Sequence, residues 1–540
     1  MNRRPLRLLL AAALAGLLAL LGSGGAPAAP LALRVPYTTI EGTGSTWSEL
    51  IVQKWIADVN ANGMKVVYTG GGSSKGRKDF AQSTNDFAIS EIPYQGVDEN
   101  GNADKSDRPY AYLPIVAGGT AFTYQLKIGG ELVRNLRLSG ETIAKIFTNQ
   151  ITNWNDPAIT ADNNGRAFPS LAITPVVRSD GSGTTAQFTT WMDDQYPSIW
   201  RPYFGHSGLT SYYPRKSGSR MVAQAGSDQV MNTVKGFAGN GTIGYVEYSY
   251  PVNASYPVVK VLNKAGYFVE PTQYNTAVAL TKAKINPTTL TQELDGVYVN
   301  PDPRAYPISS YSYMVIPTSA TDARMTTSKR QTLADFVYYS LCAGQTSAGD
   351  YGYSPLPLNL VQAGFDQVAK LKKADPGVNL TDRDVRSCNN PTFDGKNLSH
   401  NVLADVAPQP AACDKVGAGP CGIATGTNKP STDDPDAPED AADPEAPAAG
   451  PGEAGDPEAA PEEAAPEAEV DPETGLPAAD PGTATADTAG TAVYANPTLV
   501  SARAGDQRPF GVLAVVQLLA LVVVPGLIIA TLRRRPGSNR

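Results

Sequence analysis

The chain has 540 residues, a length that allows two or three domains, and it carries a formal net charge of -8. That charge lies in one segment, because residues 431–480 contain 17 Asp and Glu but no Lys or Arg. A nucleic-acid-binding protein needs a clustered basic face, so this distribution argues against nucleic acid as a partner.

Residues 1–29 have the pattern of a secretory signal peptide. Three Arg among the first seven residues precede an apolar run over 8–21, and small residues at 26–28 supply a cleavage site. An uncleaved N-terminal membrane helix is the alternative, but the apolar run is short for one. We therefore expect the residues that follow to be exported.

Residues 35–405 alternate strand-like runs, amphipathic helices and glycine turns, which is typical of an α/β protein. Three turns at 42–47, 70–76 and 180–185 are rich in Gly, Ser and Thr, and each precedes a predicted helix. Free N–H groups and the helix dipole make such a turn suited to binding an anion, and the hydroxyls add donors. Ordinary helix capping explains one such turn, whereas three together indicate an oxyanion site.

Competing explanations of these glycines fail in detail. The first turn lacks the third glycine of the dinucleotide fingerprint, and Lys75 precedes Gly76 instead of following it as in a nucleotide P-loop. Ser73 and Ser182 are conceivable nucleophiles, but the hydrolase motif G-x-S-x-G is absent around both, and the chain has only two His that might serve as a base. We therefore predict a protein that is not an enzyme and has no cofactor.

Three charged residues adjoin these turns. Arg178 immediately precedes the third turn, Asp180 lies within it, and Glu91 ends a strand-like run over 85–91. Each of them alone is most simply an exposed loop charge, the usual place of such side chains. Together with the turns, they put a cation and acceptors at the rim of the predicted anion site.

All four cysteines lie after residue 340, and an exported chain permits them to form disulfides. Cys413 with Cys421 makes a short loop and Cys342 with Cys388 a longer one, although sequence does not determine connectivity. Zinc is the competing explanation. With two His in the chain and no C-x-x-C pair, we predict no metal site.

The C-terminal part has a different composition. Residues 425–508 are acidic and rich in Pro and Ala, with too little apolar bulk for a core, and we expect a disordered tether. The apolar run 510–532 is long enough to cross a bilayer, and the Arg-rich residues 533–540 after it predict a cytoplasmic tail. We therefore expect a single-pass protein of the cell membrane with its folded domain on the extracytoplasmic face.

Taken together, these segments resemble the substrate-binding proteins of phosphate ABC transporters. The matching segments follow the family's order, at 42–47, 68–74, 86–91, 146–157, 177–185 and 241–248. The resemblance covers about 36–370, and its most specific parts are the R-x-D-G-S-G-T run from Arg178 and the G-T-I-G-Y-V-E-Y run from Gly241. The tether and the apolar C-terminal run lie outside it.

The resemblance implies a set of phosphate-binding residues. These are Thr46, Trp47, Ser73, Glu91, Arg178, Ser182, Gly183 and Thr184, with Ser45 and Asp180 in support. Glu91 stands where the family usually has Asp. Phosphate at neutral pH still carries a proton to donate to a carboxylate, whereas sulfate carries none and would meet an unpaired acceptor of like charge.

The resemblance also implies a two-lobed periplasmic-binding-protein type II fold. Lobe I would comprise 35–116 and 306–405, lobe II would comprise 117–305, and two hinge crossovers would lie near 113–121 and 305–315. Ligand binding would close the hinge. The implied function is delivery of inorganic phosphate to the transmembrane subunits of an ABC permease by a monomer. A membrane-tethered phosphate sensor or scavenger, and binding of another oxyanion such as sulfate, are the alternatives.

Overall fold

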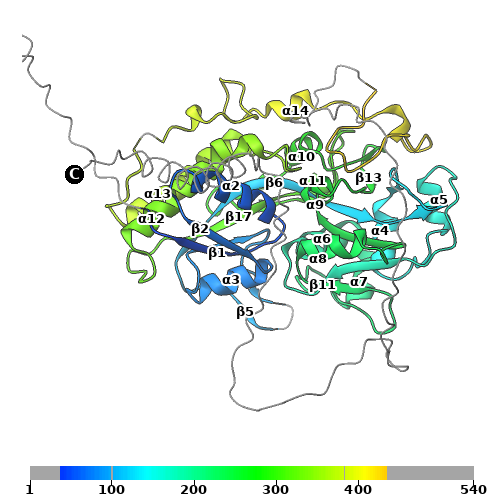
Figure 1. Ribbon diagram of the computed structural model, residues 1–540, viewed down its shortest axis with the longest axis horizontal. Helices are drawn as coiled ribbons and strands as arrows, with labels where there is room; N and C mark the ends of the chain where they lie inside the picture. Colours follow the sequence, from blue (N-terminus) through cyan, green and yellow to red (C-terminus); the bar gives the residue numbers. More distant parts are fainter. Residues whose placement is uncertain (1–36, 99–100, 382, 434–540) are drawn as a thin grey trace, which may run out of the picture. The chain divides into compact units, whose positions relative to one another are not determined.

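An eight-stranded mixed sheet runs through the residues that the computed structural model describes, which are 37–98, 101–381 and 383–433 (Figure 1). Its strand order is β11-β10-β12-β6-β17-β3-β1-β2. The strands of this sheet are β1 (Ile40–Gly44), β2 (Val66–Gly70), β3 (Phe87–Ser90), β6 (Tyr110–Tyr124), β10 (Thr174–Arg178), β11 (Val222–Gln224), β12 (Thr242–Glu247) and β17 (Ser309–Pro317). The expected α/β class is confirmed.

Two long strands join the halves of this sheet. Strand β6 pairs antiparallel with β17 along its first part and with β12 along its second, from Thr120↔Glu247 to Tyr124↔Ile243. On one side β1 pairs in parallel with β2 and β3, and on the other β10 pairs in parallel with β11 and β12. Both joining strands are almost entirely buried, which their apolar and aromatic residues make favourable. The predicted crossovers near 113–121 and 305–315 fall largely within β6 and β17.

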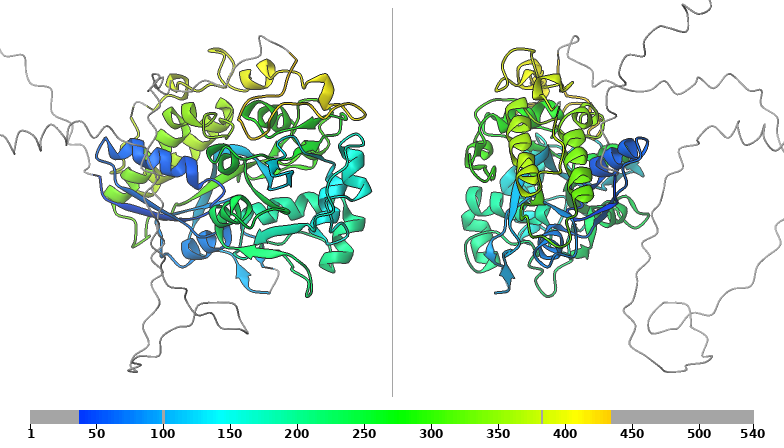
Figure 2. Two further views of the ribbon diagram at one scale, coloured as in Figure 1. Left: turned by 45° about the vertical axis from the view of Figure 1, so that its right-hand side comes forward. Right: turned by 90° about the vertical axis from the view of Figure 1, so that its left-hand side faces the viewer.

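Helices cover both faces of the sheet. They are α2 (Glu49–Asn60), α3 (Ser73–Ala81), α4 (Gly140–Phe147), α5 (Pro157–Asp162), α6 (Gly183–Gln195), α7 (Pro197–Phe204), α8 (Gly226–Lys235), α9 (Ser249–Asn253), α10 (Gln273–Leu280), α11 (Asp295–Tyr298), α12 (Thr327–Leu341), α13 (Leu358–Ala374) and α14 (Val402–Val406), with short 3-10 turns at Ala343–Ser347, Val385–Ser387 and Ala412–Asp414. The pair α12 and α13 lies side by side on one flank (Figure 2).

Short strands complete the described part. They are β4 (Gly96–Val97), β5 (Ala103–Asp104), β7 (Lys127–Ile128), β8 (Glu131–Leu132), β9 (Arg137–Leu138), β13 (Lys260–Leu262), β14 (Phe268–Val269), β15 (Lys284–Ile285) and β16 (Gln292–Glu293). Of these, β14, β13 and β9 form a three-stranded sheet, and the others form two-stranded hairpins or pairs.

The three predicted turns each lead from a parallel strand into a helix. They connect β1 to α2, β2 to α3, and β10 to α6. The carboxyl ends of parallel strands are where α/β proteins bind ligands, because loops and helix N-termini meet there. The first helix begins at Glu49 with Ser48 at its N-cap position, so Trp47 lies in the turn, within the predicted range 42–47.

The chain remains folded beyond the predicted end of lobe I at 405. Residues 411–433 pack on the other half of the molecule, where Asp414 pairs with Lys260 of β13 and Thr425 is fully buried. In Figure 1 the chain after α13 runs along the top to α14, and the gold segment 411–433 lies beyond α14 near β13. The first residues assigned to the tether, 425–433, are therefore part of the folded domain.

Both suggested cysteine pairings are confirmed, Cys342 with Cys388 and Cys413 with Cys421.

Several sequence predictions lie outside the described residues. These are the signal peptide at 1–29, the tether from 434 to 508, the apolar run 510–532 and the tail 533–540. Within the described ranges, none of the helices combines the length and apolar character needed to span a membrane.

Candidate functional site

Glu91 lies buried at the end of β3, and each of its carboxylate oxygens accepts a hydrogen bond from a serine. Ser73, the first residue of α3, donates its hydroxyl to Oε2 at 2.6 Å. Ser312 of β17 donates to Oε1 at 3.0 Å. The carboxylate is thus held at both oxygens, and each oxygen retains a further lone pair that can accept another donor.

Arg178 ends β10 and is also buried, with Asp180 as its partner. The guanidinium Nε donates to Asp180 Oδ1 at 2.7 Å, and Nη2 pairs with Oδ2. Burial is the largest single effect on Asp180 and would raise its pKa. The charge and hydrogen bonds of Arg178, with the Gly226 N–H, together outweigh burial and hold this pKa below its ordinary value. Burial would likewise lower the pKa of Arg178, and Asp180 outweighs that effect and raises it. Both groups therefore stay charged at neutral pH.

Ser227 connects the arginine to the first predicted turn. It accepts a hydrogen bond from Arg178 Nη1 at 3.3 Å, and its hydroxyl lies 3.1 Å from the hydroxyl of Thr46. The backbone N–H of Ser227 also donates to Thr46 Oγ1 at 3.2 Å. Residues from β1 and from β10 are thereby joined in one hydrogen-bonded network, although they lie on opposite sides of the joining strands.

The second and third turns meet each other as well. Gly183 donates its N–H to Ser73 Oγ at 3.1 Å, and the N–H of Ser74 donates to Gly181 O at 3.0 Å. A Cβ at position 183 would lie 2.0 Å from Glu91 Oε2, so a residue with a side chain would collide with the carboxylate. Glycine is required here by close approach.

The N-terminus of α6 presents a donor toward this network. Ser182 caps the helix by accepting a hydrogen bond from the Thr185 N–H at 3.1 Å. The Thr184 hydroxyl is buried and has no hydrogen-bond partner within the described residues. An unpaired buried hydroxyl costs free energy, and an oxyanion is a partner that would satisfy it.

The structure brings together most of the predicted site residues. Hydrogen bonds connect them in two clusters. One holds Ser73 with Glu91 and Gly183, and the other holds Arg178 with Asp180 and, through Ser227, with Thr46. Trp47 was predicted to bind phosphate, but its backbone N–H already donates a hydrogen bond to Ser45 Oγ at 2.9 Å. The Trp47 indole packs at the edge of the Tyr353 ring.

Sequence reasoning missed Ser227 and Ser312. Ser227 follows Gly226 at the start of α8, so the same Gly-Ser pattern that marked the other turns was a usable signal. Ser312 lies within an apolar and aromatic strand, and nothing in its immediate neighbours distinguishes it from a core residue.

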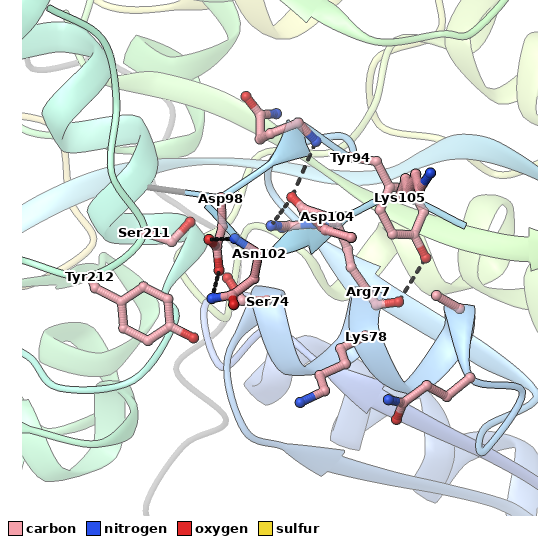
Figure 3. A pocket seen from close by; sticks show the side chains of 14 residues that line it. Ser74, Arg77, Lys78, Tyr94, Asp98, Asn102, Asp104, Lys105, Ser211 and Tyr212 are labelled. Atoms are coloured by element: carbon pink, nitrogen blue, oxygen red, sulfur yellow. Dashed lines mark hydrogen bonds and ion pairs between the residues drawn. The ribbon is translucent and has the colours of Figure 1, made fainter. Parts of the chain in front are cut away.

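A pocket of about 470 Å³ borders this network (Figure 3). It lies between α3, the β4–β5 hairpin and residues 211–212, and Ser74 belongs to its wall. Arg77 of α3 holds the hairpin by donating from Nε and Nη2 to Asp104, at 3.0 and 2.8 Å. The lining of this pocket includes Ser74 but neither Glu91 nor Arg178.

Comparison with known proteins gives a consistent result. A family model described as "PBP superfamily domain" matches residues 33–343. The chain is 31% identical over 360 residues to the phosphate-binding protein PstS of Methanocaldococcus jannaschii, covering 65% of this chain and 91% of the relative. It is 28% identical over 325 residues to the phosphate-binding protein PstS 2 of Mycobacterium tuberculosis, covering 59% and 83%. A solved phosphate-binding protein from Stenotrophomonas maltophilia matches with a TM-score of 0.46 and 18% identity, covering 63% of this chain and 99% of that one.

Proposed function

The chain belongs to the PBP superfamily, within the family of phosphate-binding proteins of ABC transporters, and on this premise we propose that it binds inorganic phosphate outside the cytoplasm and delivers it to an ABC-type permease. The observation that carries the proposal is a pair of buried clusters at the three turns. In one, Ser73 and Ser312 hold the carboxylate of Glu91, and in the other Ser227 joins Thr46 to the guanidinium of Arg178. A singly or doubly protonated oxyanion matches both groups.

The proposed ligands are those that the sequence suggested, with one addition. Arg178 supplies charge-assisted hydrogen bonds, and the hydroxyls of Thr46, Ser73 and Thr184 with the N-terminus of α6 supply neutral donors. Glu91 accepts the hydrogen bond of a phosphate O–H group. Ser227 is the addition, because it lies between Thr46 and Arg178. Asp180 neutralises the arginine without occupying all of its donors.

We propose the two-lobed type II arrangement for the folded domain, with 35–116 and 306–405 as lobe I and 117–305 as lobe II. Its support is the pairing of β6 with β17 in the middle of the sheet, because among the described strands these two lie between the two sets of parallel strands. Bending there would open the network between the Ser73 turn and the Gly183 turn. We further propose that 510–532 anchors a monomeric protein in the cell membrane and that no reaction is catalysed.

Calorimetric titration of the full chain in detergent, freed of bound anion, tests the proposal. We expect phosphate to bind and sulfate to release no measurable heat, because the Glu91 carboxylate repels an anion that has no proton to donate. Replacing Glu91 by Gln should allow sulfate to bind, since the repelling charge is gone. Equal binding of both anions by the unaltered chain would contradict the proposal, as would binding of neither.

A further inference from the structure

Ser312 reaches Glu91 because of strand register. Strand β17 pairs antiparallel with β3, and Tyr313 lies opposite Ser90, so the next position along each strand sets Ser312 opposite Glu91. The pairing of β17 with β6 shifts register between Ser312 and Tyr313. The unpaired residue at this bulge is Ile115 of β6, so the register of β17 against β3 is left unchanged. The Ser312 hydroxyl consequently meets a carboxylate 221 residues away in sequence, at 3.0 Å.

The proton of the Ser312 hydroxyl has two acceptors within reach. One is Glu91 Oε1 at 3.0 Å and the other is the hydroxyl of Ser48 at 3.2 Å. A hydroxyl has only one proton to donate, and a carboxylate is the stronger acceptor. The Ser312 hydroxyl therefore donates mainly to the carboxylate, and its contact with Ser48 is the weaker of the two. All three side chains are buried, so water does not compete for these bonds.

The two serines that hold Glu91 differ in what else they do. Ser73 also accepts the N–H of Gly183 from the other half of the molecule, so its hydroxyl is shared between the carboxylate and the third turn. Ser312 lies on the joining strand β17 and makes its bond within one half of the sheet. It therefore keeps Glu91 in place whether or not the Gly183 turn is engaged. Glutamate has three side-chain torsions, and without this bond the carboxylate is free to take other rotamers.

We propose that Ser312 is a positioning residue that determines anion specificity, because it holds the Glu91 carboxylate in the one orientation that accepts the proton of an oxyanion and repels an unprotonated one. The proposal rests on the proposed function of the site. Its prediction concerns the ratio of two affinities, whereas a purely structural role would weaken the binding of all anions alike.

The test measures the dissociation constant of phosphate by direct titration, and that of sulfate by its competition with phosphate at high sulfate concentration, for the full chain and for Ser312→Ala. We expect the phosphate affinity to fall about tenfold, as for loss of one hydrogen bond to a charged group, and the sulfate affinity to stay level or rise. The double variant Ser312→Ala with Glu91→Gln should bind phosphate no more weakly than Glu91→Gln alone, since the serine acts only through the carboxylate.

Ser310→Ala is the matched control. Ser310 is buried on the same strand, two residues away, and its hydroxyl has no hydrogen-bond partner within the described residues. This variant removes the same atom from β17 and should bind both anions as the unaltered chain does. Ser312→Cys, which keeps the side-chain volume and a weak donor, should fall between Ser312→Ala and the original; it also provides the measurement if the alanine variant does not fold.

The outcomes separate the two proposals. Failure of the unaltered chain to bind phosphate would overturn the proposed function. Phosphate binding by the unaltered chain, with an unchanged phosphate-to-sulfate ratio in both Ser312 variants, would overturn the role of Ser312 and leave the function standing. A fall in the affinity for both anions by the same factor would also overturn it.

Discussion

Two of the buried ion pairs among the described residues each join a basic side chain to an aspartate, but their surroundings differ. Arg178 and Asp180 are two residues apart in sequence, and the arginine still has a third nitrogen that donates to Ser227 in the anion-binding network. Lys260 and Asp414 are 154 residues apart, their side chains are almost fully buried, and they join β13 to the C-terminal segment at 2.7 Å. The hydroxyl of Ser431 closes the second pair by donating to the same Asp414 oxygen at 2.7 Å.

The difference shows that burial of a charge does not by itself indicate what the charge does. A buried pair gains little net stability, because desolvation offsets the attraction, but loss of one partner leaves an uncompensated charge. In the first pair the partner is two residues away in sequence, so the guanidinium keeps its orientation whether or not distant segments of the chain have packed. In the second pair the partner arrives only when residues 411–433 pack on β13. The first pair is therefore suited to binding and the second to holding the fold together.

The largest effect on binding is expected from Arg178→Ala. Phosphate affinity should weaken by about 2–5 kcal/mol, because the variant removes a desolvated cation and leaves Asp180 unpaired beside the anion. Calorimetric titration measures this. The control is Arg201→Ala, since Arg201 pairs with Asp193 on the exposed side of α7, and this variant should bind phosphate normally. A loss of less than tenfold in Arg178→Ala would show that the arginine does not contact the anion.

Lys260→Met is expected to have the opposite profile. The free energy of unfolding should fall by about 3–5 kcal/mol, because Asp414 is left charged and buried, while the phosphate affinity of the folded protein stays the same. Chemical denaturation of the full chain measures the first quantity. Adding Asp414→Leu should restore most of the lost stability. Loss of phosphate affinity in Lys260→Met would contradict the assignment of the Lys260–Asp414 pair to stability alone.

Glu270 makes the neighbourhood of the second pair sensitive to pH. Burial raises its pKa from 4.5 to about 7, against the opposing effect of Lys260, and its Oε2 accepts the Gly426 N–H at 2.8 Å and the Tyr248 hydroxyl at 3.1 Å. An acid whose pKa is higher when folded contributes its stability below pH 4.5, and that contribution is lost as the pH rises to about 7.

The measurement is the free energy of unfolding at pH 5 and pH 8 for the original chain and for Glu270→Gln. The original should lose roughly 2–3 kcal/mol more than the variant over this interval, because glutamine does not ionise in the buried site. Parallel losses in the two proteins would show that Glu270 does not titrate in this range.

The smallest effect is expected from Thr184→Val. This variant should weaken phosphate binding without lowering the free energy of unfolding. Phosphate affinity should fall by about 1 kcal/mol, because a donor to the anion is lost. The unfolding free energy without phosphate should stay level or rise, because a buried hydroxyl without a partner in the described residues is removed. A variant that loses stability without phosphate would contradict the assignment of this hydroxyl to the ligand.

Local features of the site were readable from the sequence. The turns at 42–47, 70–76 and 180–185 were predicted because glycine, a capping hydroxyl and the apolar spacing of a helix are written in adjacent residues. The pairing of Arg178 with Asp180 follows from the same proximity. The α/β class and the composition change after the folded domain were readable for a similar reason, since each sums many local preferences.

Other features depend on contacts between distant segments. That Ser312 opposes Glu91 depends on the register of β17 against β3, and a one-residue slip would turn the serine to the other face of the sheet. The position of the domain's end depends on Asp414 meeting Lys260, although the residues around 425–433 have the polar composition of a linker. Local sequence therefore predicts where the chain can turn and which groups it carries there. Long-range packing selects the partners, because the free energy that pairs two distant side chains comes from the whole sheet and core that bring them together.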